Sequence, residues 1–215
     1  MSQPAAEAPR NRPLREDIRD VLRTRIFEGH YPPGSRLIER DLAVEFHVSR
    51  LPVREALRML RQEGLVDERA PRGLVVAELS EKDVRDLFDV RESLEVLASR
   101  LAAERATPRD LRTLAQLVDR AEDALARGAL LESHRSNSEF HDEITRIADN
   151  TFLRSGLEPL QGRMHWLFRH VTDLRELVQE HRDLLSAIAS RDPERAARQS
   201  IMHINKYREQ FPDTV

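Results

Sequence analysis

The 215-residue chain contains no cysteine. This excludes disulfides, thiolate zinc fingers, iron–sulfur clusters and cysteine nucleophiles, so any metal must be held by imidazole, carboxylate or amide groups. Seven glycines and 5% aromatic residues argue against a β-sandwich. No apolar run reaches the ~18 residues that a membrane span needs. Met1 to Arg15 also lacks the apolar core of a signal peptide. We therefore expect a cytoplasmic protein with no membrane partner.

Lysine is nearly absent as well, because Lys82 and Lys206 are the only two. The formal net charge is −3, and residues 1–80 hold 14 arginines against 13 acidic residues. The overall charge of this half therefore does not indicate nucleic-acid binding. Any such argument depends on where the arginines cluster.

The pattern of apolar residues divides the chain into three parts. Residues 1–13, rich in alanine and proline, are expected to be a disordered lead-in. Residues 14–78 predict a helix from Leu14 that ends before Gly29, helices at 39–46 and 49–63, and a β-hairpin over 65–76 with a proline and glycine tip. Residues 79–215 predict helices without strands.

Six helices are expected after residue 79, at about 81–106, 108–127, 130–149, 151–169, 173–190 and 193–210. Ser80 with Asp83, and Thr107 with Asp110, have the spacing of capping boxes. Pro108 and Pro193 stand at first helical positions, where a missing N–H costs nothing. The fold class is therefore mainly α, with an N-terminal winged helix-turn-helix and a C-terminal all-α bundle.

The third predicted helix has two contrasting faces. Arg50, Arg54, Arg58 and Arg61 recur close to one side, and the opposite side carries an apolar set, namely Val53, Ala56, Leu57 and Leu60. Ser49 stands at the N-cap position, and Pro52 is tolerated in the first turn. Alone, such an arginine row is more often a solvated surface. Its place after a two-residue turn and before a hairpin instead favours a DNA-recognition helix.

Two stretches, 37–43 and 48–66, together with the Pro32-Pro33-Gly34 turn and the Arg72-Gly73 tip, resemble the winged helix of GntR-family bacterial transcription regulators. The resemblance covers about residues 14–78. It implies that DNA contacts come from Arg40, Ser49, Arg50, Pro52, Arg54, Arg72 and Gly73, with Arg50 and Arg54 as base readers. His47 departs from the glycine that many relatives have in the turn, and we expect it to adopt a slightly strained positive φ.

The C-terminal half carries Asn137-Ser-Glu-Phe-His141, a segment around His181, and Met202-His203. Taken singly, each histidine is more often an ordinary core or surface residue. Together these segments resemble the FCD effector domain of the FadR-type branch of the same family, over about residues 83–210. The resemblance implies a divalent metal held by Asn137, His141, His181 and His203.

Asn137 departs from the aspartate that is often found at the first ligand position. A neutral amide favours a softer, imidazole-dominated site, which suits zinc best, with nickel or manganese as alternatives, rather than calcium or magnesium. An effector carboxylate would bind the ion's open positions, and Arg91 and Arg163 are the candidates to clamp it. Arg91 could equally pair with Glu95 on the surface.

These expectations describe a non-enzymatic regulator: a homodimer that binds palindromic half-sites of operator DNA, usually as a repressor, and responds to a small organic acid. One alternative keeps the DNA role but gives the bundle a metal-free ligand such as an acyl-CoA, or none. A helical metal-dependent enzyme is the other. Against the enzyme, no carboxylate pair or Glu-x-x-His motif accompanies the histidines.

Overall fold

The computed structural model describes residues 13–168, 173–209 and 211, and the chain divides into two compact units between Glu78 and Leu79. Residues 1–12, almost all of the expected lead-in, lie outside the described residues. Each unit has its own hydrophobic core. The two units are therefore described separately.

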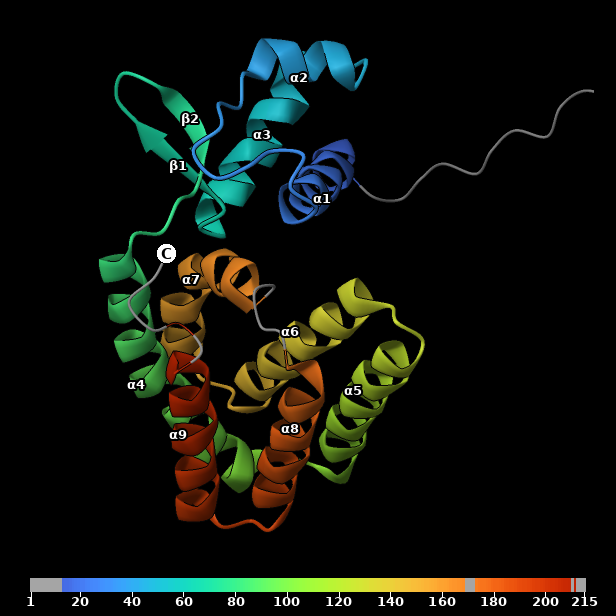
Figure 1. The fold of residues 1–215 in the computed structure, drawn as a ribbon, viewed down its shortest axis with the longest axis vertical. Helices are drawn as coiled ribbons and strands as arrows, with labels where there is room; N and C mark the ends of the chain where they lie inside the picture. Colours follow the sequence, from blue (N-terminus) through green and yellow to red (C-terminus); the bar gives the residue numbers. More distant parts are fainter. Residues whose placement is uncertain (1–12, 169–172, 210, 212–215) are drawn as a thin grey trace, which may run out of the picture. The chain divides into compact units, whose positions relative to one another are not determined.

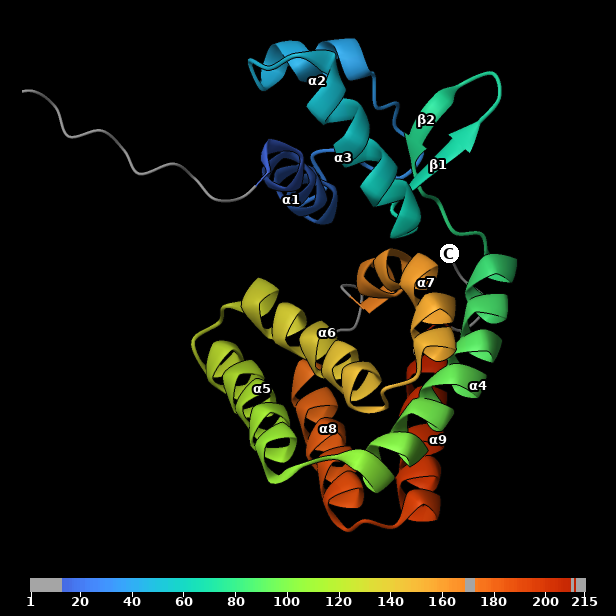
Figure 2. The same cartoon turned by 180° about the vertical axis from the view of Figure 1, so that it is seen from behind.

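The N-terminal unit is a winged helix-turn-helix (Figures 1 and 2). Its helices are α1 (Leu14–Phe27), α2 (Glu39–Glu45) and α3 (Arg50–Gln62), and an antiparallel hairpin joins β1 (Val66–Arg69) to β2 (Gly73–Val76). The segment before α2 adds to the hairpin, because Arg36 forms a bridge with Val75 and the Leu37 amide donates to the Leu74 carbonyl at 2.9 Å. That third edge was not expected from the sequence.

The apolar face of α3 forms the centre of this unit. The side chains of Val53, Ala56, Leu57 and Leu60 are completely buried. In the turn before α3, His47 has a φ of 54°, as expected. Ser49 occupies the N-cap position with extended dihedral angles, but its side chain accepts no capping hydrogen bond. The predicted cap is therefore positional only, and the Ser49 side chain is exposed.

The C-terminal unit consists of helices, as predicted: α4 (Glu81–Arg105), α5 (Pro108–Ala126), α6 (Leu130–Ile147), α7 (Thr151–Phe168), α8 (Leu174–Ala189) and α9 (Pro193–Glu209). Ser80 with Asp83 and Thr107 with Asp110 form the two expected capping boxes. Asp192 accepts hydrogen bonds from the amides of Glu194 and Arg195 at 3.0 Å. Within the described part of the chain, no helix is long and apolar enough to cross a membrane.

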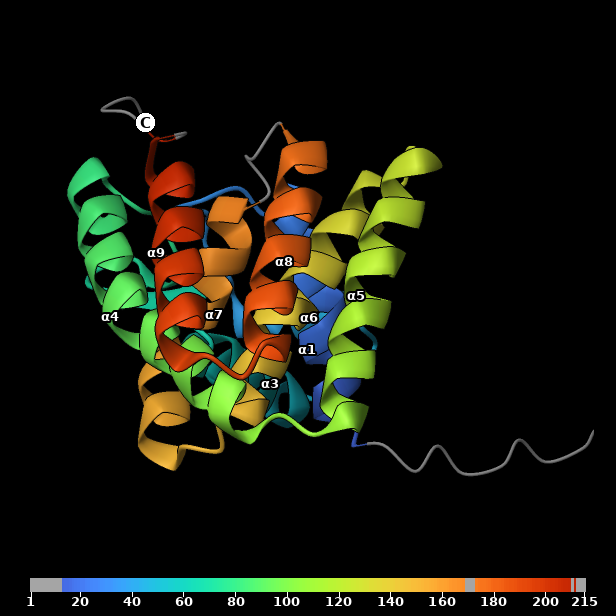
Figure 3. The same cartoon turned by 90° about the horizontal axis from the view of Figure 1, so that it is seen from below.

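Helix α4 contacts α6, α7, α8 and α9, and α5 packs on α6 and α8. Figure 3 shows α8 between α9 and α5. The core between these helices is apolar except for a set of buried polar side chains, among them Arg91, Glu95, Asn137, Glu180, His181 and His203. Buried polar groups are costly unless they are paired, so this set marks the interior as a candidate site.

Candidate functional site

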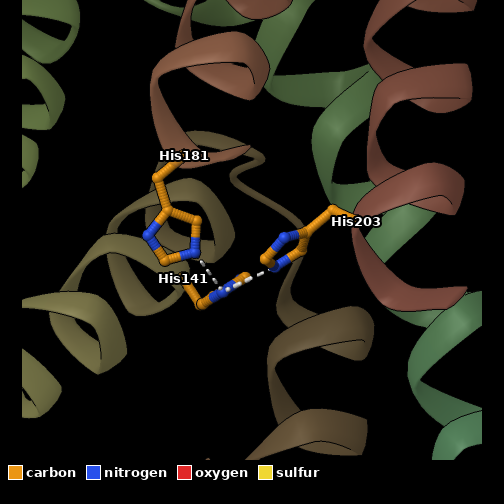
Figure 4. A group of neighbouring side chains, drawn as sticks. All are labelled: His141, His181 and His203. Atoms are coloured by element: carbon orange, nitrogen blue, oxygen red, sulfur yellow. Dashed lines mark hydrogen bonds between the residues drawn. The ribbon is translucent and has the colours of Figure 1, made fainter. Parts of the chain in front are cut away.

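Three histidines from three helices meet in the C-terminal unit: His141 of α6, His181 of α8 and His203 of α9 (Figure 4). The Nε2 atom of His141 lies 3.1 Å from Nε2 of His181 and 3.3 Å from Nε2 of His203. One nitrogen from each ring lies within 4.8 Å of the other two. We call these residues the three-histidine cluster, and its geometry could hold a metal ion.

Carboxylates face the outer nitrogens of two of these rings. His203 Nδ1 lies 2.9 Å from Oε2 of Glu180, and His141 Nδ1 lies 3.5 Å from Oε2 of Glu95. A proton on Nδ1 is favoured by a neighbouring carboxylate, which leaves the lone pair on Nε2. The inward-facing nitrogens are thus the ones available to bind a metal.

Each carboxylate is in turn held by a cation. Arg91, which is completely buried, donates to both oxygens of Glu95, with Nε to Oε1 at 2.7 Å and Nη2 to Oε2 at 3.1 Å. Lys206 Nζ lies 3.1 Å from Oε1 of Glu180. The bidentate Arg91 pair is the stronger geometry, because two parallel charge-assisted hydrogen bonds fix the carboxylate plane.

Burial lowers the pKa of His141 well below its ordinary value, and the charges of His203, Arg91 and His165 lower it further. Burial likewise lowers the pKa of His181, followed by the charges of His203 and His141. Both rings are therefore neutral at pH 7. Neutral imidazole is the form that ligates metals.

Asn137 lies one helical turn before His141 on α6 and is 2% exposed. Among the described residues, neither its amide oxygen nor its amide nitrogen has a hydrogen-bond partner. A buried amide without a partner is rare and destabilising. Together with the three imidazoles, this unsatisfied oxygen fits the donor set of a zinc-type divalent ion.

The two arginines proposed for an effector differ in their surroundings. Arg91 does pair with Glu95, but in the interior rather than on the surface, and its guanidinium lies over the rings of Phe88 and Tyr207 at 5.2 and 5.7 Å. Arg163 is half-buried on α7, and its Nη1 donates to the Pro159 carbonyl at 3.1 Å. Their effector role stays a prediction.

On the N-terminal unit, the candidate base readers share one carboxylate. Arg54 contacts both oxygens of Glu39 at 3.0–3.1 Å, and Arg50 lies 3.4 Å from the same side chain. The side chains of Arg54 and Arg50 are 58% and 62% exposed, so both are accessible. Of the other proposed DNA contacts, Pro52 is half-buried, and the exposed ones are Arg40, Ser49, Arg72 and Gly73.

The sequence motifs did not indicate the contacts that Glu39 and Glu180 make. The pairing of Glu95 with Arg91, four residues earlier on the same helix, was foreseen, but the contact of Glu95 with His141 was not. Glu180 precedes His181 in sequence but contacts His203, and Glu39 lies 15 residues from Arg54. Such pairings depend on how helices pack, which spacing along one helix does not reveal.

Comparison with known proteins bears on both units. Residues 14–76 match the bacterial regulatory proteins of the gntR family, and residues 86–206 match the FCD domain. The chain is 31% identical over 201 residues to the HTH-type transcriptional repressor RspR of Escherichia coli (strain K12), covering 92% of this chain and 88% of RspR.

Two further relatives agree. The HTH-type transcriptional regulator YdhC of Bacillus subtilis (strain 168) is 31% identical over 189 residues, which cover 86% of this chain and 84% of that protein. The solved structure of E. coli McbR/YncC matches with a TM-score of 0.77 and 26% identity, covering 94% of this chain and all of that one. The chain therefore belongs to the GntR family of DNA-binding transcription regulators, in the FadR-type branch whose C-terminal half is an FCD domain.

Proposed function

We propose that this regulator is a homodimeric repressor whose affinity for operator DNA changes when a small organic acid binds at or near a divalent metal in the FCD domain. The observation that carries the proposal is the convergence of three Nε2 atoms from three separate helices. Because the family consists of transcription regulators, a helical metal-dependent enzyme is no longer a competing account.

The metal would be held by Asn137, His141, His181 and His203. Zinc is the ion that this donor set favours, with nickel or manganese as alternatives, since three imidazoles make the site borderline-soft. When bound, the ion would supply a positive charge that could bind an anion. The chain's own residues orient the rings and bury the side chains of Asn137, His181 and His203.

The charges around the cluster support an anionic effector. None of the proposed ligands is a carboxylate, and the nearby carboxylates of Glu95 and Glu180 are each paired with a cation, Arg91 and Lys206 respectively. A divalent ion would therefore keep most of its charge. A carboxylate arriving from solution would neutralise the charge of the ion. The low dielectric constant of the buried site would strengthen the attraction between the two.

A second unsatisfied group lies on the same helix face. Ser133 stands one turn before Asn137, is completely buried, and its hydroxyl has no hydrogen-bond partner within the described residues. Ser133 and Asn137 thus present polar atoms that a small polar ligand could satisfy. A metal-free acyl-CoA-type effector would leave the convergence of the imidazole nitrogens unexplained.

A homodimer is supported by the size of one reading module, because a single recognition helix contacts only a few base pairs and two half-sites restore specificity. Palindromic half-sites follow from the two-fold symmetry of such a dimer. Repression is supported by the name of RspR, which is called a repressor.

The proposal is tested with purified full-length protein and operator fragments selected by binding from random DNA. Protein loaded with zinc and protein treated with a chelator are each titrated onto the operator, with and without members of a panel of small mono- and dicarboxylates. We expect at least one acid to change the affinity of the zinc-loaded form and not of the chelated form. If acids act equally on both forms, the metal is not part of the effector site.

A further inference from the structure

We infer that Glu95 and Glu180 are positioning residues of the metal centre, which supply from outside the ligand sphere the negative charge that Asn137 does not bring to it. The inference rests on the metal site proposed above.

Glu180 fixes the His203 ring. Both side chains are buried, and Oε2 of Glu180 lies 2.9 Å from Nδ1 of His203. The other carboxylate oxygen faces Lys206 at 3.1 Å, so each oxygen has its own partner. The ring is consequently held with Nδ1 toward the carboxylate. Its Nε2 faces His141, as Figure 4 shows.

Glu95 has the corresponding place behind His141. Its Oε2 lies 3.5 Å from His141 Nδ1, and Arg91 binds both of its oxygens. Arg91 is itself packed over the rings of Phe88 and Tyr207. Glu95 is therefore rigidly placed from α4, a helix that contributes none of the proposed ligands.

His181 is oriented in another way. Its ring stacks on Phe140, with centroids 4.5 Å apart and planes 23° from parallel. In two rings of the cluster, Nδ1 thus faces a carboxylate, whereas the third ring stacks on an aromatic ring. This difference provides an internal comparison, because removing a carboxylate should weaken the site without disturbing His181.

The expected effect follows from the chemistry of ligating histidine. An imidazole that donates its second N–H to a carboxylate is a more basic ligand and is already oriented for the metal, and losing such a partner typically costs about 10–100-fold in metal affinity. With a neutral amide at position 137, these carboxylates bring anionic charge into contact with two of the cluster's rings. The loss of metal affinity when either carboxylate is removed should therefore lie in the upper part of that range.

The test measures zinc affinity of the full-length protein by competition with a chelator of known affinity. Glu180→Gln is compared with Glu176→Gln. Glu176 lies on α8 like Glu180 and also pairs with Lys206, but it is one helical turn away from the residue that contacts His203. Glu95→Gln is compared with Glu92→Gln, which lies on the same helix and pairs with Arg208. We expect about 10–100-fold weaker zinc binding in the first member of each pair and wild-type binding in the second.

Two further readouts separate positioning from folding. The visible spectrum of the cobalt(II)-loaded protein should shift in Glu180→Gln but not in Glu176→Gln, and the apo proteins should melt alike. If Glu95→Gln fails to fold because the buried Arg91 loses its carboxylate partner, the double variant Arg91→Met with Glu95→Met removes both charges and leaves apolar side chains in their place. That double variant should fold, and it should bind zinc more weakly than the wild type does.

The outcomes are distinguishable. Wild-type protein that binds no zinc overturns the metal site itself. Wild-type protein that binds zinc, with the glutamine variants at positions 95 and 180 as tight as their controls, overturns the positioning role and leaves the metal site standing.

Discussion

Glu39, the first residue of α2, accepts hydrogen bonds from the guanidinium of Arg54 on α3 through both of its carboxylate oxygens, at 3.0–3.1 Å. Arg50 reaches the same carboxylate at 3.4 Å. The hydrogen bond from Arg54 is the main cause that lowers the pKa of Glu39, so this group is ionised at pH 7. In the protein without DNA, both candidate base readers are therefore already oriented by one acidic side chain.

Replacing Arg54 by alanine should remove a base contact and leave the fold intact, because this side chain is exposed and lies opposite the buried face of α3. The expected loss is about 1–3 kcal/mol of binding free energy on the selected operator, with a smaller loss on random DNA. Titrations on both duplexes at one fixed salt concentration measure it. Equal affinity of variant and wild type on both would show that Arg54 does not contact DNA.

Glu39→Gln should change specific and non-specific binding in opposite directions. Random DNA should bind more tightly because a negative charge near the phosphates is gone. Operator binding should weaken by about 1 kcal/mol because the arginine fork is no longer held by a charged partner. Asp41→Asn, which removes the same charge from α2 beside Arg40, is the matched control and should only raise both affinities. A parallel rise in Glu39→Gln would mean that Glu39 does not orient Arg54.

The capping box of α5 provides a pH test of stability. Hydrogen bonds from Thr107, followed by Arg146, lower the pKa of Asp110 from 3.8 to about 2. Because the folded-state pKa is the lower one, the stabilisation is complete above pH 3.8 and is lost as the pH falls through about 2. Asp110→Ala should cost about 1 kcal/mol at pH 7, and that difference should shrink toward zero as the pH approaches 2.

Denaturant unfolding of wild type and Asp110→Ala at a series of pH values measures this difference. The exposed Asp123, near the other end of the same helix, offers the control Asp123→Ala, which should be neutral at each pH. A difference between wild type and Asp110→Ala that stays constant down to pH 2 would contradict the ionised cap.

The two compact units lead to a prediction about fragments. Residues 79–215 alone should stay folded, bind metal and dimerise, because the six helices hold their own core and all four proposed ligands. Residues 1–78 alone should be a monomer that binds operator weakly. Light scattering on each fragment decides the point, and a monomeric 79–215 fragment beside a dimeric 1–78 fragment would reverse the assignment.

Features that depend on neighbours in sequence could be predicted, and features that depend on packing between helices could not. The Thr107 and Asp110 box spans four residues, and the buried face of α3 follows from a period of 3.6. The positive φ of His47 was expected because many relatives have glycine at this position of the turn. In the first two cases the determining residues lie within one helix and its N-cap.

The outer carboxylates illustrate the opposite case. Glu180 and His203 lie on different helices, and only the packing of α8 on α9 brings them to 2.9 Å. The interior position of the Arg91 and Glu95 pair likewise depends on the helices around α4, because the same spacing also occurs on solvated surfaces. For Ser49 the local pattern predicted too much. This residue is at the N-cap position, as expected, but its side chain makes no capping hydrogen bond.

Single replacement of His141, His181 or His203 by alanine should remove bound metal, whereas His134→Ala, on the same helix as His141, should not. Asn137→Asp should tighten metal binding by adding an anionic ligand, and it should weaken the response to a carboxylate effector because the ion's charge is then partly neutralised. Titrations of a carboxylate effector into the complex of protein and operator measure the weaker response. Weaker metal binding in Asn137→Asp would show that position 137 is not a ligand.

Elemental analysis of the purified full-length protein, paired with thermal melts before and after chelation, tests the metal centre most directly. An ion held by α6, α8 and α9 would tie three helices together and stabilise the folded state by mass action. The account predicts one zinc per chain and a lower melting temperature after chelation. Protein that is metal-free, takes up no zinc, nickel or manganese, and melts at the same temperature with or without chelator would contradict it.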